Sequence, residues 1–229
     1  MNSDGSGKIR VAFLNTHPIQ YFTPLYAYLN GTGTLSITAL YLSDSSVRGS
    51  LDPLFGQQVK WDVDQLAGYD AQFIGSSASR LEPGGFFSMM GPGLWKEINR
   101  ERYDALVVHG HTPAANLVAI AAAKRSGVPV FMRCETHLGL ARSWPKRMFR
   151  EPLLALLYNQ MAGVLAIGSA NAAFYKAMHV ADRKIFAMPY CVDNERFAFA
   201  AKTSHSHSPT APGSAAPRPS ARRSCRSRA

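Results

Sequence analysis

Short apolar runs alternate with helix-like segments along most of this 229-residue chain, and this alternation constrains the fold more than any other feature. Short apolar runs rich in β-branched residues are typical of buried strands, and the segments between them have helical spacing. Strands that alternate with helices form parallel sheets, because each crossover helix packs on a face of the sheet. The sequence therefore predicts the α/β class, with a doubly wound parallel sheet.

The individual elements can be placed by their apolar spacing and their turn residues. The expected strands are residues 9–14, 35–42, 71–74, 105–108, 128–133, 164–167 and 185–188. The expected helices are residues 21–29, 94–102, 113–125, 146–161 and 170–178, with Ser169 as N-cap of the last. For the long polar connection of residues 43–69 we expect an ordered loop with a brief helical piece.

The last part of the chain differs sharply from the rest. Residues 203–229 contain no Leu, Ile, Val, Met, Phe, Tyr, Trp, Asp or Glu, so we expect residues 200–229 to be a disordered basic tail. From Lys202 onward there are six basic residues and no acidic ones, so residues 1–201 carry +4 of the net +10. The tail could contact nucleic acid or anionic lipid, be solvated without a partner, or be translated out of frame. The body gives no indication of nucleic-acid binding.

The cysteines and the apolar stretches of the sequence indicate in which cellular compartment the protein is expected. Cys134, Cys191 and Cys225 include no CxxC spacing, and an odd count suits a reducing cytoplasm. The polar N-terminus, followed by a short apolar run, is unlike a signal peptide. No run approaches the roughly 18 apolar residues that a membrane-spanning helix needs. We therefore expect a cytoplasmic protein.

Polar, titratable and glycine residues gather directly after four of the predicted strands. In an open parallel sheet, ligands bind beyond the carboxyl ends of the strands, so these loops are the expected functional rim. The loops are residues 15–21, 109–113, 133–139 and 189–193. Candidate binding or catalytic side chains in them are Asn15, His17, His109, His111, Arg133, Glu135 and His137.

The sequence lacks the motifs of several common active sites and cofactor sites. A dinucleotide site would need GxGxxG after the first strand, where Asn15-Thr16-His17-Pro18 stands instead. There is no GxxxxGK[ST] phosphate loop and no GxSxG nucleophile motif. The histidines of the rim with Glu135 have weak spacing for zinc, so we expect no metal and no cofactor.

Each candidate also has a structural interpretation. His17 could cap the following helix, and His109 could be a satisfied buried histidine. Arg133 and Glu135 could simply pair with each other. His111 precedes a helix N-terminus and is better placed to face a cleft.

A basic cluster lies in and before the predicted helix 146–161. It consists of Arg142, Lys146, Arg147 and Arg150, interleaved with Trp144, Met148 and Phe149. Such a pattern suits either contact with an anionic membrane surface or an ordinary solvated helix face.

Four segments carry a resemblance to a known family. They are NTHPIQYF at residues 15–22, VHGH at 108–111, AIGSAN at 166–171 and KIFAMPYCVDNERF at 184–197. Together they resemble bacterial GT-B glycosyltransferases of family 4, also called glycosyl transferases group 1. The last segment is similar to the usual end of the first domain, a strand, a proline and a VDxxxF turn. The resemblance covers about residues 8–199 and implies a Rossmann-like, acceptor-side domain.

The resemblance implies a retaining transfer of a sugar from a nucleotide-sugar donor to a glycan or lipid-linked acceptor, as in polysaccharide biosynthesis. Members of this family have two Rossmann-like domains facing each other, and the first holds mainly the acceptor. The second holds the donor nucleotide and pyrophosphate through a basic pair and an E-x7-E motif, generally without a metal.

Matched to this sequence, the resemblance implies a role for each rim residue. His111, Glu135 and His137 would be the catalytic group near the reacting sugar, acting by position and charge. Substrate binding would fall to Asn15, His17, His109, Arg133 and Arg142. Positive charge at Arg142 and Lys146 would suit an acceptor that carries phosphate.

This sequence departs from the family pattern after Phe197, where no E-x7-E motif follows. We therefore expect a chain truncated before the donor-binding domain and inactive or very weak alone. The alternative is a free-standing module that binds a glycan or glycolipid without catalysis. Peripheral contact with the inner membrane surface is a further expectation, and no nucleic-acid partner is expected for the fold.

Overall fold

The structure is a computed structural model that describes residues 7–48, 50–52, 57–59, 64–74, 86–87, 93–100, 103–139 and 144–191, with the isolated residues 194 and 198. The tail expected at residues 200–229 lies outside the described residues, and so does Arg142. The chain divides into two compact units, Met1–Val192 and Asp193–Ala229. The elements below all belong to the first unit.

Two sheets, six α-helices and one 3-10 helix (Asp182–Lys184) make up the regular structure in the described part of this unit. The strands of the large sheet are β1 (Ile9–Asn15), β2 (Leu35–Tyr41), β5 (Asp70–Phe73), β6 (Ala105–His109), β7 (Val130–Arg133), β8 (Gly163–Ala166) and β9 (Ile185–Ala187). The helices are α1 (Thr23–Gly31), α2 (Ser45–Arg48), α3 (Leu94–Arg100), α4 (Ala114–Arg125), α5 (Trp144–Asn159) and α6 (Ser169–Ala177). A short antiparallel pair, β3 (Ser50–Asp52) and β4 (Gln57–Val59), forms the second sheet.

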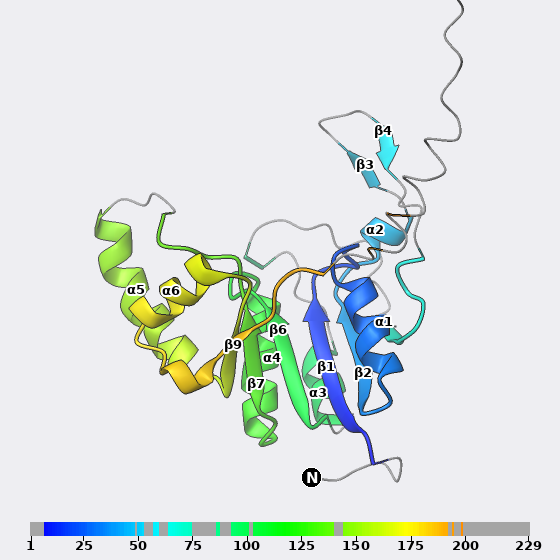
Figure 1. The fold of residues 1–229 in the computed structure, drawn as a ribbon, viewed down its shortest axis with the longest axis horizontal. Coiled ribbons are helices and arrows are strands. Elements are labelled where there is room, and N and C mark those ends of the chain that lie inside the picture. The colour runs from blue at the N-terminus through cyan, green and yellow to red at the C-terminus, as the bar shows by residue number, and fades with distance from the viewer. Residues whose placement is uncertain are drawn as a thin grey trace, which may run out of the picture. The chain divides into compact units, whose positions relative to one another are not determined.

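The large sheet has the order β5-β2-β1-β6-β7-β8-β9, and every pairing in it is parallel. The chain winds outward from β1 to β5, returns to the other side of β1, and continues to β9. The doubly wound α/β fold is therefore confirmed. All carboxyl ends meet at one edge of the sheet, the upper edge in Figure 1, and the order reverses between β1 and β6.

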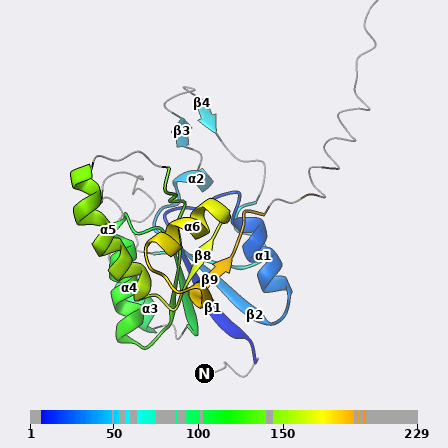
Figure 2. The same cartoon turned by 60° about the vertical axis from the view of Figure 1, so that its left-hand side comes forward.

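Side chains of the central strands alternate between two buried faces. One face packs α1 through a cluster that includes Phe13, Tyr26 and Val107. The opposite face packs α3, α4, α5 and α6 through a larger cluster that includes Leu14 and Val108. Figure 2 shows α1 on one side of the sheet and α3, α4 and α5 on the other. Burial on both faces explains why these strands read as nearly continuous apolar runs.

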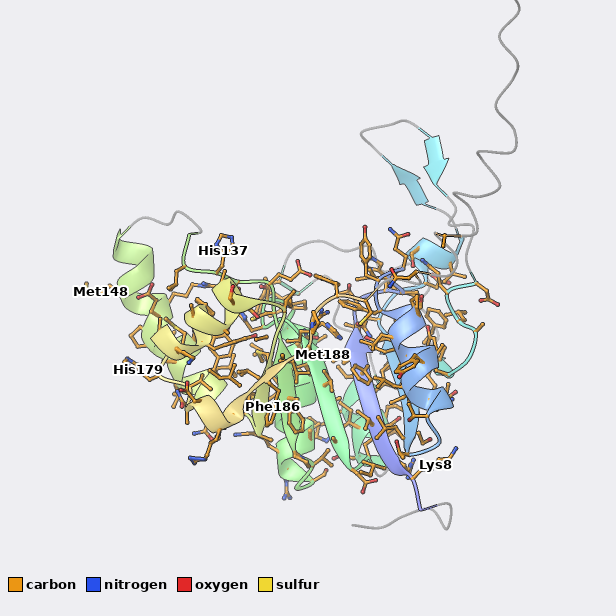
Figure 3. The ribbon with its side chains drawn as sticks, in the orientation of Figure 1. Lys8, His137, Met148, His179, Phe186 and Met188 are labelled. Atoms are coloured by element: carbon orange, nitrogen blue, oxygen red, sulfur yellow. The ribbon has the colours of Figure 1, made fainter. Side chains whose placement is uncertain are left out.

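The outer part of the α1 face is less covered than its centre. Phe186 of β9, labelled in Figure 3, is 47% exposed and lies against Phe131 of β7 with ring centroids 6.4 Å apart. Gly163 lies under these two rings: a Cβ there would meet the Phe186 ring at 2.7 Å and the Phe131 ring at 3.0 Å. Close ring packing over β8 therefore requires a residue without a side chain at this position.

The prediction that Ser169 caps the last helix is wrong. Gly168 occupies the N-cap position, and Ser169 is the first residue of α6, with no side-chain capping hydrogen bond. Strand β8 ends at Ala166, one residue before the predicted end, so the turn starts earlier. That turn is closed instead by Asn171, whose Oδ1 accepts a hydrogen bond from the backbone N–H of Ile167 at 3.1 Å.

Candidate functional site

A cavity of about 360 Å³ opens beyond the carboxyl ends of β1, β6 and β7. Its walls come from the loops after these strands and from the start of α1, and it lies where the strand order reverses. This is the position at which doubly wound sheets bind ligands. The lining residues that the sequence had singled out are His109, His111, Arg133 and Glu135.

A second cavity, of about 370 Å³, lies over the start of α6. Glu135, His137, the segment 167–171 and Tyr190 line it. Figure 3 labels His137 at the upper edge, where the strands end. Glu135 lines both cavities, so the loop after β7 forms the border between them.

Arg133, the last residue of β7, is the largest fully buried side chain among the described residues and is only 2% exposed. Its guanidinium carbon lies 4.7 Å from the ring centroid of Phe22 and 4.4 Å from that of Tyr190. Its Nη2 donates a long hydrogen bond of 3.4 Å to the backbone oxygen of Met188, labelled in Figure 3. Nε and Nη1 are buried without a hydrogen-bond partner in the described part of the chain.

Burial lowers the pKa of Arg133, and nearby Tyr26 and Glu135 partly oppose that shift. An arginine nevertheless keeps its charge in proteins. Glu135 is exposed, and no ion pair or hydrogen bond joins these two described side chains. The interpretation that Arg133 and Glu135 only pair with each other therefore fails, and the buried charge has no direct counter-ion among the described residues.

His109 lies beside Arg133 in the register of β6 and β7 and is neutral. Burial, and then the charge of Arg133, lower the pKa of His109 to about 3. The hydroxyl of Tyr26 donates to Asn15 Oδ1 at 3.1 Å, so its oxygen is left to accept from His109 Nε2 at 3.1 Å. This buried chain fixes the tautomer of His109, with the proton on Nε2 and Nδ1 unprotonated.

His111 is held by two residues of α5. Arg150 Nη2 lies 2.7 Å from His111 Nε2, and because arginine is only a donor, Nε2 must accept. The proton is therefore on Nδ1, which lies 3.2 Å from the hydroxyl oxygen of Tyr158. Both ring nitrogens are occupied in this arrangement, so proton transfer by His111 would require one of these contacts to break.

The same network continues under the cavity to the loop after β7. The Tyr158 hydroxyl lies 3.4 Å from Cys134 Sγ, and the Tyr175 hydroxyl lies 3.2 Å from the same sulfur and accepts from the Cys134 N–H at 3.1 Å. Burial raises the pKa of both tyrosines well above the usual range, so both stay protonated. Residues of α5 and α6 thereby fix the two loops that form the cavity walls.

The structure separates the predicted residues into three groups. His109, His111, Arg133 and Glu135 share one cavity, and His137 lies in the neighbouring one, where its Nδ1 accepts from the N–H of Gly139 at 3.2 Å. Asn15 is buried beneath the first cavity, and His17 contacts Thr16 at 3.0 Å without lining either cavity. His17 does not cap α1, whose N-cap position is Phe22. The roles assigned to all these residues remain predictions.

Sequence reasoning missed the aromatic residues that position the site. Phe22, Tyr26, Tyr158, Tyr175 and Tyr190 contact its polar groups from helices and from the segment after β9. In the sequence they look like ordinary apolar helix and loop positions. The available signal was the tyrosines among them, because a tyrosine hydroxyl needs a partner when it is buried, as it is in Tyr26, Tyr158 and Tyr175.

The profile of Glycosyltransferase Family 4 matches residues 71–196, more than half of the chain. The chain belongs to Glycosyltransferase Family 4. The matched segment includes β6 to β9, and with them His111, Arg133 and Glu135 at and after the ends of β6 and β7. No curated protein sequence matches the chain significantly.

Solved structures share the fold of this family member. The UDP-N-acetylglucosamine 2-epimerase from Rickettsia bellii matches with a TM-score of 0.55 and 11% identity, over 87% of this chain and 50% of its own. Anabaena Alr3699/HepE in complex with UDP-glucose matches with a TM-score of 0.50 and 11% identity, over 86% of this chain and 50% of its own. The chain thus spans about half the length of these structures.

The described residues contain no group of three or more His, Cys, Asp or Glu side chains placed to hold a metal ion. None of their helices has the length and apolar character that would let it cross a membrane.

Proposed function

We propose that this domain binds the acceptor of a retaining glycosyltransferase in the cavity at the ends of β1, β6 and β7, and that the donor is a nucleotide sugar. The observation that carries the proposal is the position of this cavity at the strand-order reversal of a Family 4 domain. Fixed polar groups line it, and pre-positioned groups are what a transfer of this kind needs.

The chemistry of transfer requires charge stabilisation more than a nucleophile. The bond from the anomeric carbon to the donor phosphate breaks, the bond to the acceptor oxygen forms, and the proton of the acceptor hydroxyl passes to the leaving phosphate. The anomeric centre becomes positive on the way, and the exposed carboxylate of Glu135 at the border of both cavities suits that charge. The start of α4 suits negative charge, because the helix macrodipole places partial positive charge at the N-terminus.

His111 acts in this proposal as a positioning residue. Its contacts to Arg150 and Tyr158 join the loop after β6 to α5, so the cavity wall keeps its shape. The described residues form one side of a transfer site. The leaving phosphate needs groups from an opposing wall, so we expect no turnover from the first unit by itself.

A binding experiment tests the acceptor site directly. Saccharide binding to the full chain is followed by saturation-transfer NMR, and Thr112→Trp fills the cavity from an exposed wall position. Thr34→Trp is the matched control, because Thr34 is also exposed but precedes β2 at the opposite edge of the sheet. Loss of saccharide signal in Thr112→Trp alone supports the site.

Equal signals from both variants, with unchanged melting temperatures, would contradict an acceptor site in this cavity. A transfer assay with UDP- and GDP-sugars accompanies the titration. Robust turnover by the purified chain would contradict the need for an opposing wall, whereas binding without turnover is the outcome that the proposal expects.

The proposed acceptor includes lipid-linked glycans, and an exposed apolar face of α5 supports this. Met148, Leu153 and Leu156 are 51%, 67% and 62% exposed on that helix. The helix sequence also contains three basic residues and one acidic residue, which complements an anionic lipid surface. We expect Leu153→Ser/Leu156→Ser to reduce co-sedimentation with vesicles that contain phosphatidylglycerol. Unchanged sedimentation would contradict membrane contact through α5.

A further inference from the structure

Arg133 is buried, but the described part of the fold does not pair all of its hydrogen-bond donors. A charged side chain that is 2% exposed normally has its donors paired, yet Nε and Nη1 have no acceptor within the described residues. The contacts to Phe22, Tyr190 and Met188 hold the guanidinium in place but leave these two donors unsatisfied. These two donors belong to a residue that also lines the cavity.

We propose that Arg133 is the receptor for an anionic group of the acceptor, a carboxylate or a phosphate. The inference rests on the proposed function, because it takes the ligand of this cavity to be the acceptor. An oxyanion with two oxygens matches a fork of the guanidinium, which pairs Nη2 with either Nε or Nη1, and it would give one of the two unpaired donors a charged partner.

The surroundings of Arg133 also favour an anion. His109, its neighbour on β6, offers no negative charge, and Glu135 forms no ion pair with it. The same cavity is lined by His111 and Thr112, which precede the first turn of the 12-residue helix α4. The N-terminus of a helix attracts anions, so both α4 and the guanidinium of Arg133 would stabilise an anion bound in this cavity.

The competing explanation is that Arg133 is only a structural anchor. Its hydrogen bond to Met188 and its contact with Tyr190 connect the segment after β9 to the sheet, and Tyr190 also contacts Tyr21 before α1. Figure 1 shows this segment passing from β9 across the α1 face. An anchor and an anion receptor predict opposite effects of removing the charge.

The test compares Arg133→Met and Arg133→Lys with the native chain. Methionine keeps much of the side-chain volume without charge, and lysine keeps the charge without the fork. Arg125→Met is the matched control, because Arg125 is an exposed arginine at the end of α4. The probes in isothermal titration are glucuronate, glucose 6-phosphate, glucose and UDP at constant ionic strength.

We expect at least one acidic sugar to bind about tenfold or more tightly than glucose, consistent with charge-assisted hydrogen bonds. Arg133→Met removes this preference, Arg133→Lys retains part of it, and Arg125→Met leaves it unchanged. A preference for glucuronate identifies the group as a carboxylate, and one for glucose 6-phosphate identifies it as a phosphate.

Three outcomes would overturn the inference. The first is equal affinity for glucose and both acidic sugars, which leaves the acceptor site intact if Thr112→Trp still abolishes binding. The second is a preference for acidic sugars that survives in Arg133→Met. The third is binding of UDP through Arg133 that exceeds that of both acidic sugars, because the guanidinium would then serve the donor. No binding of any saccharide would instead contradict the proposed function itself.

Thermal unfolding without ligand separates the receptor from the anchor. If Arg133 is a receptor whose donors are unsatisfied without ligand, the melting temperature of Arg133→Met should equal or exceed that of the native chain. The reason is that the apolar replacement removes a buried, unpaired charge. An anchor predicts a clear loss of melting temperature in Arg133→Met relative to Arg125→Met. That loss, together with unchanged anion affinity, would assign Arg133 to the fold alone.

Discussion

His109 makes the stability of this domain depend on pH in a way that can be calculated. Burial and the nearby charge of Arg133 lower its pKa from 6.5 to about 3 in the folded protein. In the unfolded chain the imidazole regains its ordinary pKa. Between pH 6.5 and pH 3 the unfolded state therefore binds a proton that the folded state does not, and the free energy of unfolding falls as the pH falls.

The magnitude follows from the two pKa values. At pH 5 an imidazole with a pKa of 6.5 has gained about 2 kcal/mol from protonation, whereas one with a pKa near 3 has gained almost nothing. At pH 7.5 neither form is protonated to a significant extent. The folded domain should therefore lose about 2 kcal/mol between pH 7.5 and pH 5 through His109 alone.

Urea denaturation at both pH values measures this loss, with His109→Gln as the non-titrating comparison. Glutamine can still donate a hydrogen bond toward Tyr26, and the other histidines contribute equally to both proteins. We expect the change in unfolding free energy between the two pH values to be about 2 kcal/mol smaller in the variant. The reasoning fails if the two proteins lose the same stability within about 0.5 kcal/mol.

Three further predictions follow from single positions. Gly68→Ala should lower the free energy of unfolding, measured by urea denaturation, by about 2–4 kcal/mol, because φ of Gly68 is +86° and a new Cβ would lie 2.8 Å from Ala27 Cβ. In the control variant Gly127→Ala, φ is +73° but the space around the new Cβ is open, so the loss should be only about 1–2 kcal/mol. Asn171→Ala should lower the free energy of unfolding by about 2 kcal/mol or more, because the variant loses a buried amide that closes the turn before α6. A loss below about 0.5 kcal/mol in urea denaturation would argue against that role. An anion in the cavity should raise the pKa of His109 in an NMR titration, because it offsets the charge of Arg133, and an unmoved pKa would place the anion elsewhere.

Local sequence determined the elements and the edge of the sheet that carries the site. All seven strands of the large sheet were predicted. The central strands are apolar runs whose burial is visible in their composition, and the exposed edge strands β5 and β9 are short segments next to turn residues. The rim followed from the same pattern, because carboxyl ends of parallel strands share one edge. The pair β3 and β4 was missed, because three-residue strands carry too little periodicity.

Only the tertiary structure decided what each rim residue contacts. His111 meets Arg150 and Tyr158, which are 39 and 47 residues away in the sequence, and His109 meets Tyr26 at a separation of 83. Arg133 lies against rings from the α1 region and from the segment after β9 rather than pairing with Glu135 two positions along. Hydrogen-bond partners depend on how helices pack across the sheet, and that packing is a property of the whole core, whereas strand and helix periodicity is a property of neighbouring residues.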